Sequence, residues 1–252
     1  MSDPIRAPDD PAKARRLEGL RARLRAVEQG GRAPLPLGAP ALDAALGGGL
    51  AVGRLHEVAG AEGEAAAAGF CAVLLGRLAA AAGKPVLWCA AAGDLYAPGL
   101  GAFGLDPGAA ILALAAGRAE LLWAIEEGLR CRGLAAVLGE ADGVDLAAGR
   151  RLQLAAEAGG TTGLLLGRPR GNAPAFSAAV TRWRVTSAHS LPREAGKGWG
   201  GGPRWRVELL RCRGGAPATW LVEWNDATGD LAVAAALRDG PAAAATARRA
   251  RR

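Results

Sequence analysis

The stretch that decides the fold reads LGAPALDAALGGGL over residues 37–50 and GRLHEVAG over residues 53–60. Leu42 and Leu46 stand four residues apart, so a short helix would place both side chains on one face, against a sheet. The glycines at 47–49 mark a tight turn, and residues 55–58 are typical of a short strand. Such a strand leads to a loop at the carboxyl edge of an open α/β sheet, where phosphate groups bind.

This stretch resembles the segment that leads into the ATPase core of RecA, RadA and KaiC-type proteins. In those proteins a run of the form TGxxxLDxxLGGGLxxGxxxEIxG precedes the phosphate-binding loop. The resemblance covers residues 37–60 with small gaps. It implies an α/β protein with a RecA-like P-loop-type core.

The chain that follows alternates apolar strands with amphipathic helices. This alternation predicts a mostly parallel sheet that is covered by helices on both faces. We expect the strands at 85–89 and 110–114 to be buried, because their residues are apolar with little interruption. The other expected elements are strands at 135–139 and 163–166 and helices at 64–82, 120–132 and 145–158.

The pattern changes after residue 175. Alternating polar and apolar residues at 180–186 and 204–211 predict half-buried antiparallel strands, and residues 219–224 return as a further strand. We therefore expect a C-terminal antiparallel β extension of the sheet. The expected organisation is a disordered start with an amphipathic basic helix at 1–33, a RecA-like core at 34–175, a C-terminal β-segment of the same domain at 176–238 and a disordered basic tail at 239–252.

The residues after the strand at 55–58 should form the phosphate-binding loop, whose pattern is GxxxxGK[ST]. Residues 60–67 read GAEGEAAA instead. Gly60 fits the first glycine and Gly63 lies within the turn, whereas Ala65, Ala66 and Ala67 replace the second glycine, the lysine and the hydroxyl residue. The lysine reaches the phosphates and the hydroxyl holds Mg²⁺. We therefore expect no catalytic residue, no cofactor and no metal site.

The acidic residues around this loop lead to the same expectation. Glu62 and Glu64 would face the phosphates and repel them. Glu140, after the strand at 135–139, stands where a Walker B acid would hold a metal, and we interpret it as a vestigial strand-end acid. RecA-like ATPases carry a water-activating glutamate just past the strand at 86–89, but here the first acid is Asp94.

Composition limits the classes of function. The 252 residues carry a net charge of +7, and four of those charges belong to the arginines of the last five residues. The body is therefore only mildly basic, so weak nucleic-acid binding is an open alternative. The sequence has no apolar run typical of a membrane span and no apolar signal segment, which predicts a cytoplasmic protein with no membrane association.

The remaining motifs narrow the family. Trp88, the run DLYAPGL at 94–100, the helix at 150–157 and the run RWRV at 182–185 resemble the ImuA family. ImuA proteins are RecA-related accessory proteins of bacterial damage-induced mutagenesis and are also labelled SulA-like. The resemblance implies a non-catalytic scaffold in SOS-induced error-prone translesion DNA synthesis. The implied partners are an ImuB-type inactive Y-family polymerase and, indirectly, an error-prone C-family DNA polymerase.

Two other functions stay open, namely an ATP-binding regulatory protein of the RecA or KaiC type and a SulA-like cell-division inhibitor. Self-association and binding to RecA are also open.

The amphipathic helix needs a surface to pack on, either this chain's own core or a partner. The candidate partner or DNA contacts are Leu17, Leu20, Leu24, Arg150, Arg151, Arg182, Arg184, Arg248 and Arg249. The tryptophans at 183, 205, 220 and 224 are interpreted as core residues because they occur in alternating strands.

Overall fold

The computed structural model describes residues 19, 32–167, 177–190 and 202–237. The expected amphipathic helix, with Leu17, Leu20 and Leu24, lies outside these residues, as does the expected tail with Arg248 and Arg249. No helix among the described segments is both long enough and apolar enough to cross a membrane.

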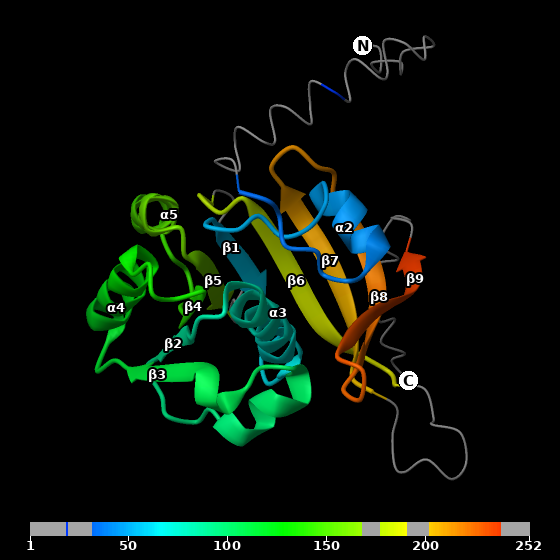
Figure 1. The fold of residues 1–252 in the computed structure, drawn as a ribbon, viewed down its shortest axis with the longest axis horizontal. Coiled ribbons are helices and arrows are strands. Elements are labelled where there is room, and N and C mark those ends of the chain that lie inside the picture. Colours follow the sequence, from blue (N-terminus) through cyan, green and yellow to red (C-terminus); the bar gives the residue numbers. More distant parts are fainter. Residues whose placement is uncertain (1–18, 20–31, 168–176, 191–201, 238–252) are drawn as a thin grey trace, which may run out of the picture.

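One nine-stranded sheet organises the molecule, in the order β3-β2-β4-β5-β1-β6-β7-β8-β9 (Figure 1). The strands from β3 to β6 in this order run parallel, and β7, β8 and β9 add antiparallel. The strands are β1 Leu55–Ala59, β2 Val86–Ala90, β3 Ala110–Leu114, β4 Ala136–Glu140, β5 Thr162–Gly167, β6 Thr181–Ala188, β7 Arg204–Cys212, β8 Ala218–Asn225 and β9 Asp230–Leu237. The predicted mostly parallel sheet with an antiparallel C-terminal extension is confirmed.

Helices cover both faces of the parallel half of the sheet. Helix α3 (Ala66–Ala82) packs on one face, and α4 (Arg118–Arg130) and α5 (Leu146–Gly159) pack on the other (Figure 1). Neighbouring residues of a strand serve opposite cores: Leu164 and Leu166 face α3, and Leu165 faces α4 and α5. The leucines at 164–166 are consecutive because both faces of β5 are buried.

Short helix α2 (Pro40–Leu46) precedes β1 and buries Leu42 and Leu46, as the sequence predicts. Asp43 stabilises the preceding chain by accepting a hydrogen bond from the Leu37 amide at 2.7 Å. The turn that follows brings the chain back beside residue 35, where Leu35 and Leu50 exchange backbone hydrogen bonds of 2.8 Å. Gly49 has φ 140° in this turn, a backbone conformation that favours glycine.

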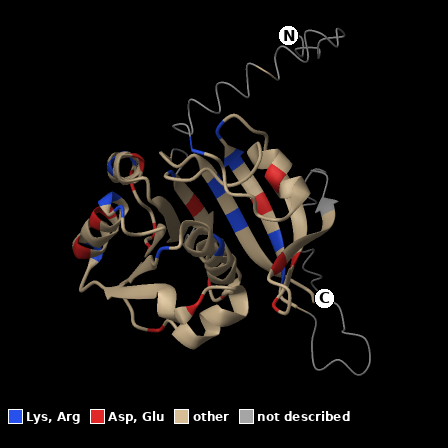
Figure 2. Cartoon of the chain, viewed as in Figure 1, with Lys and Arg blue, Asp and Glu red and all other residues tan. Residues whose placement is uncertain are grey.

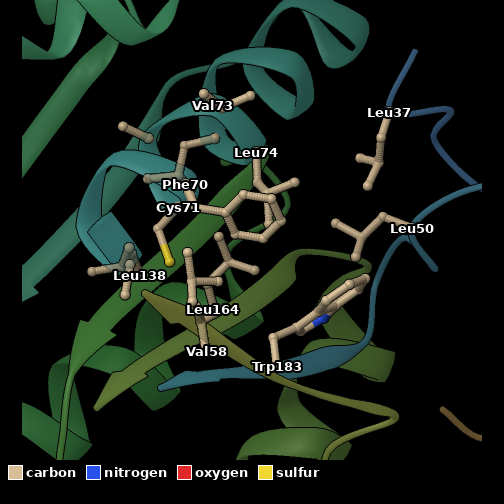
Figure 3. Packing of buried hydrophobic residues seen from close by; sticks show 14 of the residues in the cluster. Leu37, Leu50, Val58, Phe70, Cys71, Val73, Leu74, Leu138, Leu164 and Trp183 are labelled. Carbon is tan, nitrogen blue, oxygen red and sulfur yellow. The ribbon is translucent and has the colours of Figure 1, made fainter. Parts of the chain in front are cut away.

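The largest core lies between α3 and the sheet (Figure 3). Phe70 points from α3 toward Trp183 on β6, with ring centroids 5.9 Å apart, and meets Trp205 on β7 edge to face. Trp220 and Trp224 on β8 are buried in the same core. The interpretation of these four tryptophans as core residues is confirmed, and α3 thereby packs onto both halves of the sheet.

The structure corrects the expectation for residues 110–114. They form a strand, but β3 is the first strand of the sheet and is largely exposed. Ile111, Leu112 and Leu114 expose between 44% and 57% of their surface. Two short 3₁₀ helices, η1 (Ala97–Phe103) and η2 (Pro107–Ala109), fill the connection between β2 and β3. Side chains of a strand stand perpendicular to the sheet, so Ile111, Leu112 and Leu114 are exposed because the helices do not cover them at this edge of the described sheet.

Candidate functional site

The loop between β1 and α3 occupies the place of a phosphate-binding loop. Strand β1 ends at Ala59, and α3 begins at Ala66 after a loop that includes a turn at Gly63. The Gly60 amide donates to the carbonyl of Gly167 at the end of β5, at 2.9 Å. The loop therefore lies at the carboxyl edge of the parallel strands, where open α/β sheets bind ligands.

The side chains at the start of α3 pack into the protein. Ala66 and Ala67 are 5% and 2% exposed. The methyl group of Ala67 lies against Gly60, so close that a Cβ at Gly60 would stand 2.8 Å from it. A methyl group offers neither a positive charge nor a metal ligand. The positions that correspond to the lysine and the hydroxyl of a phosphate-binding loop are therefore filled with apolar contacts.

Glu64 connects the loop to β6, the strand on which the antiparallel extension begins. Its carboxylate accepts a hydrogen bond of 2.8 Å from the backbone amide of Ser187 on β6. From the sequence we expected Glu64 to face bound phosphates. In the structure its side chain contacts β6. The loop carries a fixed negative charge at this point, which is unfavourable for a bound polyphosphate.

Glu140 lies at the end of β4 and is engaged by the neighbouring strand. The Trp88 indole on β2 donates a hydrogen bond of 2.7 Å to its carboxylate. Cys71 on α3 is buried nearby, and its burial together with the charge of Glu140 raises the pKa of its thiol. Asp94, the first acid after β2, is exposed. Within the described residues, no cluster of His, Cys, Asp and Glu side chains could hold a metal ion.

The candidate arginines fall into two groups. On α5, Arg150 is exposed and Arg151 pairs with Glu126 of α4 at 2.5 Å. On β6, Arg182 pairs with Glu57 at 3.1 Å and Arg184 pairs with Glu208 of β7 at 3.3 Å. These two lie two residues apart on one strand, so both face the same side of the sheet. The structure brings together Arg182 and Arg184, and places Arg150 and Arg151 on a helix.

The sequence reasoning missed an exposed apolar region at β3. Ile111, Leu112 and Leu114 on β3 are 49%, 44% and 57% exposed. Nothing in the residues 110–114 distinguishes this strand from the buried strands, because an apolar run does not show the place of a strand in the sheet. The surface becomes visible only when the order of the strands is known.

Comparison with solved structures identifies the fold. The RadB recombinase superposes with a TM-score of 0.54 at 17% identity, covering 80% of this chain and 100% of that one. A KaiC-like protein from the hyperthermophilic archaeon Pyrococcus horikoshii gives a TM-score of 0.54 at 14% identity, covering 79% of this chain and 98% of that one. The RecA-like core predicted from residues 37–60 is confirmed.

Comparison with characterised sequences identifies the family. No protein-family model matches the chain. Protein ImuA from two strains of Caulobacter vibrioides is 42% identical over 217 residues, which cover 80% of this chain and 88% of the relative. The family resemblance seen in the sequence motifs is thereby confirmed. This chain belongs to the ImuA family.

Proposed function

We propose that the chain is a non-catalytic scaffold in SOS-induced, error-prone translesion DNA synthesis in the cytoplasm. Membership of the ImuA family supports the pathway. The observation that carries the non-catalytic role is the loop at residues 60–65, which is followed by the buried Ala66 and Ala67 and tied to β6 by Glu64. Phosphoryl transfer depends on a lysine and on Mg²⁺ at these positions. A core built in this way serves as a platform for other proteins.

The partner in this proposal is an ImuB-type inactive Y-family polymerase, which in turn recruits an error-prone C-family DNA polymerase. The edge of β3 supports a docking role. Within the described residues β3 pairs with β2 only, and an edge strand can accept a further strand from another chain. Leu112 and Leu114 add apolar area beside the unpaired backbone. Burial of such side chains favours binding of a partner.

Binding to the ImuB-type protein of the same genome tests this surface. We expect Leu112→Asp with Leu114→Asp to abolish co-purification of the pair, because the charges would have to be buried in the interface. The matched control is Leu154→Asp, since Leu154 on α5 is 64% exposed and equally apolar. Unchanged binding by the double variant would remove β3 from the proposal, and failure of the wild-type chain to bind would remove the partner.

Calorimetry with ATP and Mg²⁺ tests the rival function of an ATP-binding regulator. We expect no binding heat and no DNA-stimulated hydrolysis. Clear micromolar binding would support the rival.

A cellular assay tests the third function, a cell-division inhibitor. Deletion of the gene should lower damage-induced mutation frequency, whereas filamentation on expression without a mutation phenotype would favour a cell-division inhibitor.

A further inference from the structure

The part of the sheet formed by β6 and β7 has one face buried in the core and one face with exposed side chains. Along β6, Trp183 and Val185 point into the core under α3, so Arg182, Arg184 and Thr186 point the other way. Strand β7 repeats this alternation around the buried Trp205, Val207 and Leu209. Figure 2 shows basic positions recurring along both strands. The outward arginines of these two strands, Arg182, Arg184, Arg204, Arg206 and Arg211, are here called the arginine face.

The acids on this face neutralise the arginines only in part. Glu208 is shared, because it pairs with Arg184 at 3.3 Å and with Arg206 at 2.6 Å. Arg184 is 54% exposed and Arg206 is 48% exposed, whereas Glu208 is 18% exposed. One partly covered carboxylate therefore lies between two guanidinium groups that reach solvent. Two other arginines of the face are paired and mostly covered, since Arg182 pairs with Glu57 at 3.1 Å and Arg204 pairs with Glu223 at 3.5 Å, with side chains 17% and 10% exposed. Arg211, opposite Arg182 in the strand register, is exposed.

The chemistry of the face fits a chain of phosphates. Guanidinium groups bind phosphate oxygens through paired hydrogen bonds, and a flat row of them can contact a backbone at several points. Trp183 and Trp205 point into the core, so the described residues of β6 and β7 offer no outward aromatic ring on which bases could stack. Contacts from this face would therefore go to the sugar-phosphate backbone and would not depend on base sequence.

The charge of the described strands favours an extended polyanion over an acidic peptide. The arginines of the face pair with three carboxylates among the described residues, those of Glu57, Glu208 and Glu223. The remaining positive charge is spread over two neighbouring strands, which fits a ligand with regularly repeated negative charges.

We propose that the arginine face binds the phosphate backbone of a nucleic acid. This surface is distinct from the free edge of β3, which β2, β4, β5 and β1 separate from β6 in the sheet order. A scaffold with both surfaces would hold a protein partner at the edge of β3 and DNA on the face of β6 and β7. The two proposals are independent, so failure of one leaves the other standing.

Fluorescence anisotropy with the full chain and a labelled oligonucleotide tests the proposal. We expect single strands of unrelated sequence, and their duplexes, to bind with an affinity that falls steeply with salt, because each phosphate contact contributes about −0.9 to the slope of log K against log salt in duplex DNA. Arg184→Ala with Arg206→Ala should lower the magnitude of that slope by about two. Affinity at low salt should fall by roughly tenfold.

Removing a negative charge from the face should have the opposite effect on affinity. Glu208→Gln keeps the hydrogen-bonding shape but removes the carboxylate between the two arginines, so nucleic-acid binding should tighten. Arg132→Ala is the matched control, because Arg132 is an exposed arginine after α4 and its loss lowers the net charge equally per residue. We expect this control to change the affinity much less than Arg206→Ala does.

Three results would overturn the proposal. The first is no binding of either oligonucleotide at low salt. The second is binding that falls as much with Arg132→Ala as with Arg206→Ala, which would indicate a dependence on total charge only. The third is binding of a polyglutamate peptide that depends on Arg206 while DNA binding does not, which would assign the face to an acidic protein. Thermal melts of each variant show that the fold is kept.

Discussion

The buried side chain of His56 has a hydrogen-bond partner for each of its two ring nitrogens. Its Nε2 donates to the carbonyl of Ala51 at 2.8 Å, since that oxygen can only accept, and its Nδ1 therefore accepts from the Thr181 hydroxyl at 2.6 Å. The Trp183 indole donates to the same hydroxyl oxygen at 2.7 Å. These bonds connect β1 to β6 through a neutral imidazole. Burial favours the neutral form and lowers the pKa of His56 to about 4.

A pH dependence of stability follows from this residue. The pKa is lower in the folded chain than in the unfolded chain, so the unfolded state binds a proton first as the pH falls. We expect the free energy of unfolding to decrease by about 2 kcal/mol between pH 7 and pH 5 from this group. Denaturant unfolding measures it, with His56→Gln as the reference. Equal pH slopes in the two proteins would contradict the assignment.

At the scale of elements, the turn after α2 leaves no room for a side chain at Gly49. A Cβ on Gly49 would stand 2.7 Å from the Pro36 nitrogen and closer still to the Leu35 carbonyl, in a backbone with φ 140°. We expect Gly49→Ala to lower the free energy of unfolding by about 3 kcal/mol or more. Gly63→Ala is the control.

Gly63 also has a positive φ, but a Cβ there would meet no atom within 4 Å. Gly63→Ala therefore measures the cost of a positive φ alone, and we expect it to lower the free energy of unfolding by about 1 kcal/mol. Chemical denaturation of both variants measures the difference. If the two substitutions cost the same, the close approach of residues 35 and 49 does not limit the turn.

Elements could be predicted from the sequence where the spacing of apolar residues shows which side chains are buried. The helix of Leu42 and Leu46 and the alternation around Trp183 and Trp205 follow from where each side chain points. The absence of a lysine and a hydroxyl residue at positions 66 and 67 is also evident from the residues alone, and the loss of nucleotide binding that we expect from it stays a prediction.

Features that depend on which strands are neighbours could not be predicted. Ile111 is exposed because β3 ends the sheet, and no residue of the strand records that position. The contact between Glu64 and Ser187 joins residues 123 positions apart. The sharing of Glu208 between Arg184 and Arg206 requires the register of β6 with β7. Each of these needs the three-dimensional pairing of segments that the local pattern leaves open.

At the scale of the whole molecule, the residues on which the proposed loss of nucleotide binding rests belong to several elements. Ala66 and Ala67 are on α3, Glu64 is tied to β6, and Glu140 is bound by Trp88 of β2. We expect the triple variant Ala65→Gly, Ala66→Lys and Ala67→Thr to show no DNA-stimulated ATP hydrolysis, because the acid expected after β2 would still be missing. A coupled phosphate-release assay measures this, and robust turnover by the variant would contradict it.

The central place of β1 also has a consequence for how the chain reaches its fold during synthesis. Strand β1 lies between β5 and β6, so both of its neighbours are made much later, and His56 waits for a hydroxyl that is 125 positions further along. Until β6 has left the ribosome, one edge of β1 lacks its neighbour and Phe70 of α3 lacks Trp183. Late closure of distant contacts slows folding and exposes apolar surface, so the nascent chain carries uncovered apolar side chains through most of its synthesis.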